Sequence, residues 1–129
     1  MSALGLGLVA LGGALGAVCR FWVGIGWAVF TETELPAPTL FVNVTGSLLL
    51  GALFGLLQPD TSQVLDAPAL LFAGVGFCGA YTTFSSFCTE FVSLGRHRWG
   101  LALGYLAATA IGCVGAFGAA YWLLGQGFP

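Results

Sequence analysis

The sequence has no lysine and few charged residues of any kind. Its 129 residues include three arginines, five Asp or Glu residues and one histidine, so that 6% are charged and the net charge is −2. Soluble domains carry roughly 25% charged residues, whereas 58% of this chain is hydrophobic. The composition therefore excludes an ordinary water-soluble domain. Because no basic stripe can form, it also excludes a nucleic-acid partner.

Close cysteine pairs are absent as well. Cys19, Cys78, Cys88 and Cys113 each lie alone within an apolar stretch, with no CxxC spacing and no neighbouring ligand cluster. This distribution argues against a structural zinc site and against a disulfide framework. We interpret the four residues as small apolar side chains.

The sequence consists mainly of long apolar runs. A helix needs about 20 mainly apolar residues to cross the hydrocarbon core of a bilayer. Such runs, each with at most one charged side chain, extend over about residues 3–31, 37–58, 68–92 and 99–125. The sequence thus predicts one domain over residues 1–129, an all-α membrane protein with four transmembrane helices. The expected location is the cell (inner) membrane.

The orientation of these helices is weakly specified. Arg96 and Arg98 fall on the same predicted side as Glu32 and Glu34, and the opposite side carries no Lys or Arg. Two arginines favour the cytoplasm only slightly. A fixed orientation and insertion in both orientations, giving an antiparallel dimer, both remain open. The second would reproduce with two chains the inverted-repeat plan of transporters.

Glycines at GxxxG spacing let helix backbones approach closely. Three such pairs are Gly12 with Gly16, Gly51 with Gly55, and Gly100 with Gly104. They predict tight helix packing without identifying an interface.

The third run is unusual because residues 74–86 read GVGFCGAYTTFSS. Glycine weakens a helix by about 1 kcal/mol relative to alanine, and Thr and Ser add smaller penalties. We expect a break near Gly79 to Thr83. Broken backbone at membrane depth is tolerated where it lines a cavity, and its freed groups can bind ions. The alternative is an unbroken helix whose hydroxyl groups bond to the preceding turn.

The polar groups near this break suit a small anion. Hydroxyl donors follow one another at Thr82, Thr83, Ser85 and Ser86. Phe84 and Phe87 lie three residues apart, on one helix face, and the edge of a phenyl ring is electropositive. Asn43 lies within the second run and adds two N–H donors. The alternative for the two rings is ordinary packing.

Three further polar features stand out in the apolar runs. Arg20 lies within the first run, where a charge marks a functional site unless its side chain reaches the interface. Tyr105, Thr109 and Cys113 recur every four residues and so share one helix face. Glu90 is near the end of the third run, where a solvent-exposed cap is the alternative to a functional role.

Three segments together have a familiar order and spacing. They are residues 12–17 (GGALGA) with Arg20, residues 39–43 (TLFVN) followed by Gly46, and residues 76–87 (GFCGAYTTFSSF). These segments resemble the CrcB/Fluc family of fluoride channels over essentially the whole chain. The TTFSxF core after a glycine turn is the most specific of them.

The resemblance implies a fluoride-selective channel that exports fluoride and relieves its toxicity in the cell. It also implies an antiparallel, dual-topology homodimer with two pores, and not an enzyme. By the same resemblance, the fluoride path contains Asn43, Phe84, Phe87, Ser85, Tyr105 and Thr109, with Arg20 near a vestibule.

The resemblance further implies a structural sodium ion at the dimer interface, held by the backbone carbonyls of Gly79 and Thr82. Glu90 matches an acidic position of the family. The chain departs from the family at Cys88 and Cys113, where hydroxyl side chains are expected along the polar track. A thiol is a weaker donor than a hydroxyl, so we expect slower conduction or a smaller role for that part of the track.

Three other kinds of protein fit the sequence less well. A proton-coupled multidrug exporter needs a carboxylate within the membrane, and residues 1–31 contain no Asp or Glu. A scaffold subunit would need neither a polar third run nor Arg20. An enzyme is the least compatible, because so few polar groups cannot assemble a nucleophile, a base and an orienting group.

Overall fold

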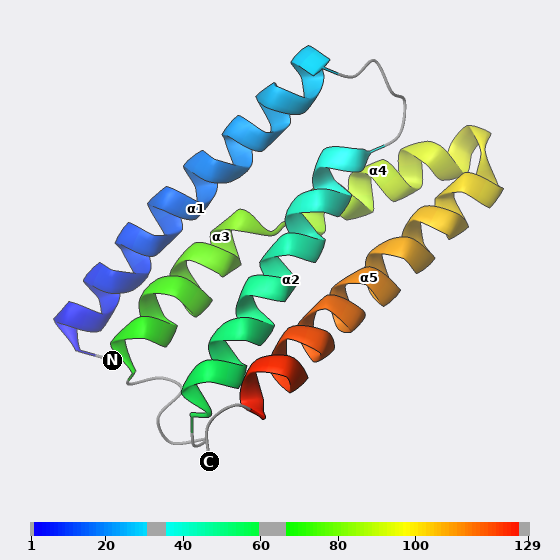
Figure 1. The fold of residues 1–129 in the computed structure, drawn as a ribbon. Coiled ribbons are helices and arrows are strands. Elements are labelled where there is room, and N and C mark those ends of the chain that lie inside the picture. The colour runs from blue at the N-terminus through cyan, green and yellow to red at the C-terminus, as the bar shows by residue number, and fades with distance from the viewer. Residues whose placement is uncertain (1, 31–35, 60–66, 127–129) are drawn as a thin grey trace.

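The structure is a computed structural model that describes residues 2–30, 36–59 and 67–126. All regular elements within these ranges are helical (Figure 1). They are α1 (Ala3–Phe30), α2 (Ala37–Leu57), the π-helical segment η1 (Leu70–Cys78), α3 (Gly79–Tyr81), α4 (Phe84–His97) and α5 (Trp99–Gly125).

The helices group into four segments that are long and apolar enough to cross a membrane, which confirms the predicted number of spans. These are Ala3–Phe30, Ala37–Leu57, Leu70–His97 and Trp99–Gly125. Large apolar side chains such as Trp22, Phe30 and Ile111 are exposed on the outside, as expected where lipid replaces water. The chain is therefore a multi-pass membrane protein. The end of the first predicted run, residue 31, and Glu32 and Glu34 lie outside the described residues.

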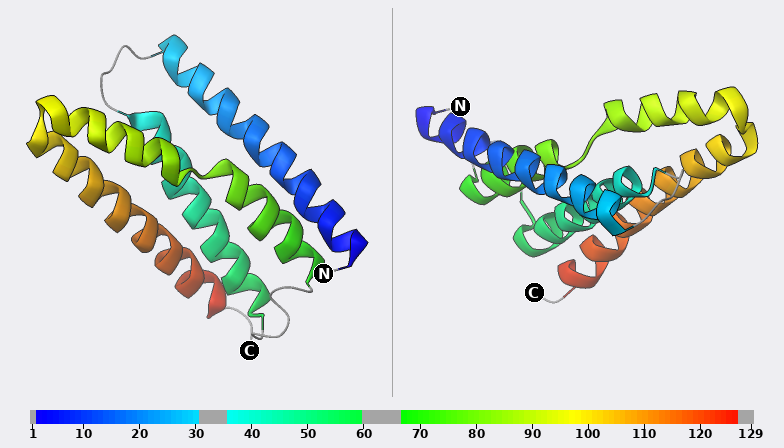
Figure 2. Two further views of the ribbon diagram at one scale, coloured as in Figure 1. Left: turned by 180° about the vertical axis from the view of Figure 1, so that it is seen from behind. Right: turned by 90° about the horizontal axis from the view of Figure 1, so that it is seen from above.

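Helix α2 runs through the middle of the bundle. It packs along α5 on one side and against η1 on the other, while α1 covers η1 and α3 (Figures 1 and 2). This arrangement places the second, third and fourth spans side by side, so that their polar residues can meet.

Glycines allow these close helix contacts. A Cβ atom at Gly12 or Gly16 would collide with the Phe72 or Phe77 carbonyl of η1. A Cβ atom at Gly51 would likewise collide with the backbone of Phe117 in α5. Only hydrogen fits at such positions, so two of the three predicted glycine pairs are packing contacts within the chain. The third pair, at residues 100 and 104, faces open space among the described residues.

The third span changes direction in its middle. Helix α3 ends at Tyr81, Thr82 and Thr83 have extended backbone with ψ of 161° and 120°, and α4 begins at Phe84. The Thr83 hydroxyl accepts a hydrogen bond from the Ser86 N–H at 3.2 Å and so caps α4. Figure 2 shows α4 leaving the direction of α3 and running beside α5.

Candidate functional site

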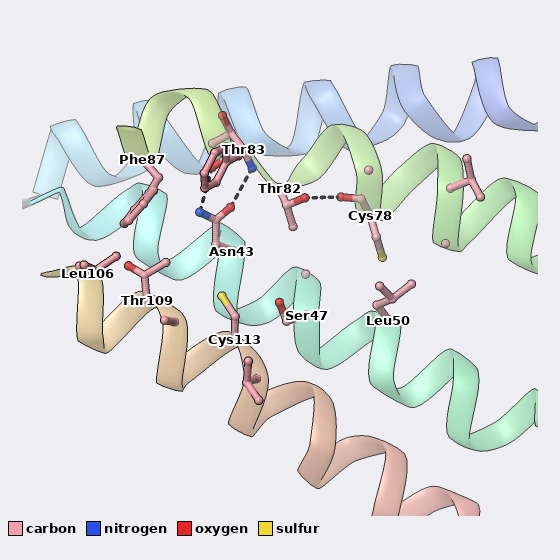
Figure 3. Close-up of a pocket in the computed structure, with 17 residues that line it drawn as sticks. Asn43, Ser47, Leu50, Cys78, Thr82, Thr83, Phe87, Leu106, Thr109 and Cys113 are labelled. Carbon is pink, nitrogen blue, oxygen red and sulfur yellow. Dashed lines mark hydrogen bonds between the residues drawn. The ribbon is translucent and has the colours of Figure 1, made fainter. Parts of the chain in front are cut away.

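An open groove of about 500 Å³ lies between α2, α5 and the two halves of the third span (Figure 3). Six of the residues predicted from the sequence line it: Asn43, Gly79, Thr82, Phe84, Phe87 and Thr109. Its other described lining residues include no charged side chain. The groove therefore offers an ion only dipoles and ring edges.

Asn43 of α2 is joined to the extended backbone of Thr83 by two hydrogen bonds. The Thr83 N–H donates to Asn43 Oδ1 at 2.8 Å, and Asn43 Nδ2–H donates to the Thr83 carbonyl at 3.0 Å (Figure 3). Both residues are 8% exposed, where unpaired polar groups are costly. The side chain thus satisfies a peptide that has left the helix. It retains one N–H, for which the described residues provide no acceptor.

These bonds redirect the helical hydrogen bonding around the break. In a continuous α-helix, the Thr83 N–H would donate to the Gly79 carbonyl and the Ser86 N–H to the Thr82 carbonyl. Instead, the first donates to Asn43 Oδ1 and the second to Thr83 Oγ1. The carbonyls of Gly79 and Thr82 consequently lose their helical donors. Each becomes an oxygen that can bind a cation.

Phe84 and Phe87 begin α4 as a ring pair. Their centroids are 5.8 Å apart with an interplanar angle of 29°. Phe84 is 77% exposed, whereas Phe87 is 8% exposed and packs 5.2 Å from the ring of Tyr105. One ring is therefore fixed in the core, and the other projects from the open side of the groove.

Thr109 and Cys113 of α5 line the groove, one helical turn apart, opposite Ser47 of α2 (Figure 3). The Thr109 hydroxyl donates to the Tyr105 carbonyl at 2.8 Å. Tyr105 itself lies behind Phe87 and does not line the groove. Of the predicted polar face of α5, Thr109 and Cys113 therefore line the groove, whereas Tyr105 packs against Phe87 away from it.

Glu90 joins three helices, a contact that sequence reasoning did not find. Its two carboxylate oxygens accept hydrogen bonds from the Thr39 hydroxyl and the Tyr105 hydroxyl, both at 2.7 Å. Because the side chain is partly buried and doubly bonded, Glu90 is not a solvent-exposed cap. Thr39 is 51 residues away in the chain, so no local pattern could have paired them. The only signal was that all three are polar residues within apolar runs.

Besides Tyr105, two predicted residues lie outside the groove. Arg20 is half-buried on α1, and Ser85 is exposed on α4 with its hydroxyl 3.3 Å from that of Thr83. Neither is among the lining residues. Within one chain, the groove thus contains Asn43, Thr109 and the two Phe residues of the predicted path, but not Ser85, Tyr105 or the predicted vestibule residue Arg20.

The sequence matches the family described as CrcB-like protein, Camphor Resistance (CrcB), over residues 7–121. It is 44% identical over 109 residues to the fluoride-specific ion channel FluC of Nitrobacter winogradskyi, covering 84% of this chain and 85% of that protein. It is also 41% identical over 118 residues to the FluC protein of Gloeobacter violaceus, covering 88% and 90% of the two chains. A third relative, from Halobacterium salinarum, is 44% identical over 118 residues, which cover 91% of this chain and 90% of the relative. With the match extending through all four spans, the chain belongs to the CrcB family.

Proposed function

We propose that this protein is a fluoride-selective channel that lets fluoride leave the cell. The observation that carries the proposal is a groove between three spans that contains an amide donor, hydroxyl groups and a Phe pair but no charged side chain. Relatives that are 41–44% identical along most of their length are named fluoride-specific ion channels. A pore must replace the water around its ion without holding the ion too tightly, and dipoles meet that requirement.

The ring edges of Phe84 and Phe87 would contact fluoride next to the remaining N–H of Asn43. The carbon-bound hydrogens at a ring edge carry partial positive charge. The Thr109 hydroxyl lines the same groove from α5. This hydroxyl and that of Tyr105 each donate within the protein, so binding fluoride there requires them to exchange one hydrogen bond for another. Such an exchange holds the ion only loosely.

An antiparallel homodimer would complete the pathway. In a single chain the groove is open, Phe84 is 77% exposed, and a Cβ at Gly79 would meet nothing within 4 Å. These surfaces lie together at the break in the third span, which supports the break as the site where a second copy packs. The small arginine bias permits opposite insertion of the two copies.

Sodium fits the same surface. The Gly79 and Thr82 carbonyls have lost their helical donors to Asn43 and Thr83, and carbonyl oxygens of unwound helices are sodium ligands in membrane transporters. Two such oxygens from each of two symmetric copies would surround one ion at the dimer axis. If so, replacing sodium by a large organic cation should lower the thermal unfolding midpoint of the dimer.

Efflux from liposomes tests the proposed function directly. Purified protein is reconstituted in liposomes loaded with fluoride and chloride, and release is followed by two ion-selective electrodes after the membrane potential is clamped. Rapid fluoride release with chloride retained is the expected result. Protein-free liposomes are the control for leakage. Equal release of both ions, or no release from a monodisperse dimer, would contradict the proposal.

A further inference from the structure

The peptide group between Thr82 and Thr83 has its two polar ends in different surroundings. Its N–H, from Thr83, donates to Oδ1 of Asn43 at 2.8 Å, and Asn43 lines the groove (Figure 3). Its carbonyl, from Thr82, accepts no hydrogen bond from the residues that the structure describes. The peptide is trans, and the N–H and C=O bonds of a planar trans peptide point in opposite directions. The Thr82 carbonyl is therefore directed away from Asn43.

The side chain of Thr82 is held by two other residues. Its backbone N–H and its hydroxyl both donate to the Cys78 carbonyl, at 3.0 Å and 2.9 Å (Figure 3). Its methyl group lies against Gly46 of α2, which is buried. A Cβ atom at Gly46 would collide with this methyl group and lie 3.3 Å from Cδ1 of Tyr81. Glycine is thus the residue that leaves room for Thr82 in this conformation.

A larger residue at position 46 would disturb the Thr82–Thr83 peptide. Threonine is β-branched and has few side-chain conformations, so the Thr82 methyl group can move in only two ways. Either the side chain rotates and its hydroxyl leaves the Cys78 carbonyl, or the backbone shifts and strains the bond between Thr83 and Asn43. Both changes release a contact that holds the Thr82 carbonyl in place.

We propose that Asn43 and Gly46 are positioning residues for the Thr82 carbonyl as a sodium ligand. Asn43 holds the N–H end of the peptide, and Gly46 receives the side chain at the other end. This inference rests on the sodium site of the proposed function. Ligands of a binding site must be held within about 0.5 Å of their productive positions. One rigid peptide then joins a residue of the anion groove to a cation ligand, so that sodium affinity depends on Asn43 as well as fluoride efflux.

Sodium titrations of thermal unfolding test this inference on the full-length protein in detergent. Sodium would replace N-methylglucamine at constant ionic strength, and the unfolding midpoint would be measured at each concentration. A ligand that binds only the folded protein raises the midpoint with its concentration, which yields an apparent dissociation constant. A substitution that merely weakens the fold lowers the midpoint at every sodium concentration and leaves this constant unchanged. The dissociation constant therefore distinguishes positioning from general stability.

Asn43→Ala should raise the apparent dissociation constant for sodium about tenfold. The substitution removes the acceptor of the Thr83 N–H, so that one end of the peptide is released and a buried donor is left unpaired. Size-exclusion profiles check that the dimer persists at the sodium concentrations used.

Gly46→Ala should raise the same constant about 3–10-fold, because its Cβ displaces the Thr82 methyl group. The double variant Gly46→Ala/Thr82→Ser should recover most of this loss. Serine lacks the colliding methyl group and keeps the hydroxyl that donates to the Cys78 carbonyl. Gly24→Ala is the matched control, since a Cβ at Gly24 would meet nothing within 4 Å, and it should leave the constant unchanged.

Two outcomes would overturn the inference. One is a wild-type unfolding midpoint that does not depend on sodium. The other is a dissociation constant that Asn43→Ala leaves unchanged, a test that remains if Gly46→Ala does not fold. Fluoride efflux from liposomes separates this inference from the proposed function. The expected shifts in sodium affinity without fluoride release would refute the channel and retain the positioning role, whereas wild-type fluoride release with unshifted sodium affinity in the variants would do the reverse.

Discussion

Two regions on the flanks of the third span are held together by different forces. Between α1 and η1, Gly12 and Gly16 bring the backbones so close that no Cβ fits. At the break, by contrast, Asn43 and Thr83 meet through two hydrogen bonds. The first region depends on shape and dispersion, the second on a few polar atoms. Substitution in the first should therefore remove the folded protein, whereas substitution in the second should remove conduction from a protein that still assembles.

Gly12→Ala should have the largest effect. Its Cβ would overlap the Phe72 carbonyl oxygen and lie 3.0 Å from the Phe77 nitrogen, so that α1 and η1 must separate. Overpacking of this kind costs about 1–3 kcal/mol or more. We expect a lower thermal unfolding midpoint and a smaller yield of monodisperse protein in detergent.

Gly24→Ala is the matched control on the same helix, because a Cβ at Gly24 would meet nothing within 4 Å. It should be neutral or slightly stabilising, since alanine favours helix more than glycine does. Equal stability of the two variants would show that the close contact between α1 and η1 does not hold the fold.

Asn43→Asp should have the next largest effect, and on flux more than on folding. The substitution replaces the Nδ2–H that donates to the Thr83 carbonyl with an oxygen that repels both this carbonyl and a passing anion. Losing one buried hydrogen bond costs about 1–3 kcal/mol, and 1.4 kcal/mol corresponds to a tenfold change in rate. Fluoride efflux should fall by about 10–100-fold while the dimer persists.

Thr45→Ala provides the comparison for Asn43. The Thr45 hydroxyl donates to the Phe41 carbonyl at 2.7 Å, is 3.1 Å from the Tyr81 hydroxyl of α3, and lies outside the groove. Its loss should change efflux less than about threefold, since the helical backbone bond remains. Similar losses in both variants would mean that any polar change in α2 impairs conduction, and the special role of Asn43 would be lost.

The two rings of the Phe pair should respond alike in flux and differently in stability. Phe84→Ile and Phe87→Ile each remove a ring edge from the groove, so fluoride efflux should fall at least about tenfold in each. Phe84 is 77% exposed and Phe87 is 8% exposed. Within the single chain, only Phe87 is buried, so Phe87→Ile should also lower the free energy of unfolding of the chain, by about 1 kcal/mol. Wild-type efflux in both variants would show that the ring edges do not contact the ion on its path.

The sequence predicted what local composition determines. Uncharged runs predicted the four spans, and GxxxG spacing predicted the contacts of Gly12 and Gly51. The same spacing at Gly100 and Gly104 faces open space within the chain. GxxxG spacing shows which face of a helix carries small residues, but not whether another helix lies against that face. How the helices pack in three dimensions determines this.

Local sequence patterns could not predict the hydrogen bonds between the spans. Asn43 and Thr83 are 40 residues apart, and Thr39 and Glu90 are 51 apart. The sequence showed that each is polar within an apolar span, and hence that each needs a partner. Choosing the partner requires the spans to be placed side by side, which no periodicity in one segment reveals. The resemblance identified Asn43 as a donor to the ion, whereas the structure shows that one of its N–H groups already serves the break.

Cys113→Ser should have the smallest effect and the opposite sign. Cys113 lines the groove one turn from Thr109 and opposite Ser47 (Figure 3), and a hydroxyl donates a stronger hydrogen bond than a thiol of similar size. Gaining such a donor on the path should raise fluoride efflux about 2–5-fold without moving the unfolding midpoint. Cys19→Ser, on the outer face of α1, should leave efflux unchanged. If Cys113→Ser also leaves efflux unchanged, the conducting path ends at Thr109. The part of the groove around Cys113 would then not contact the ion.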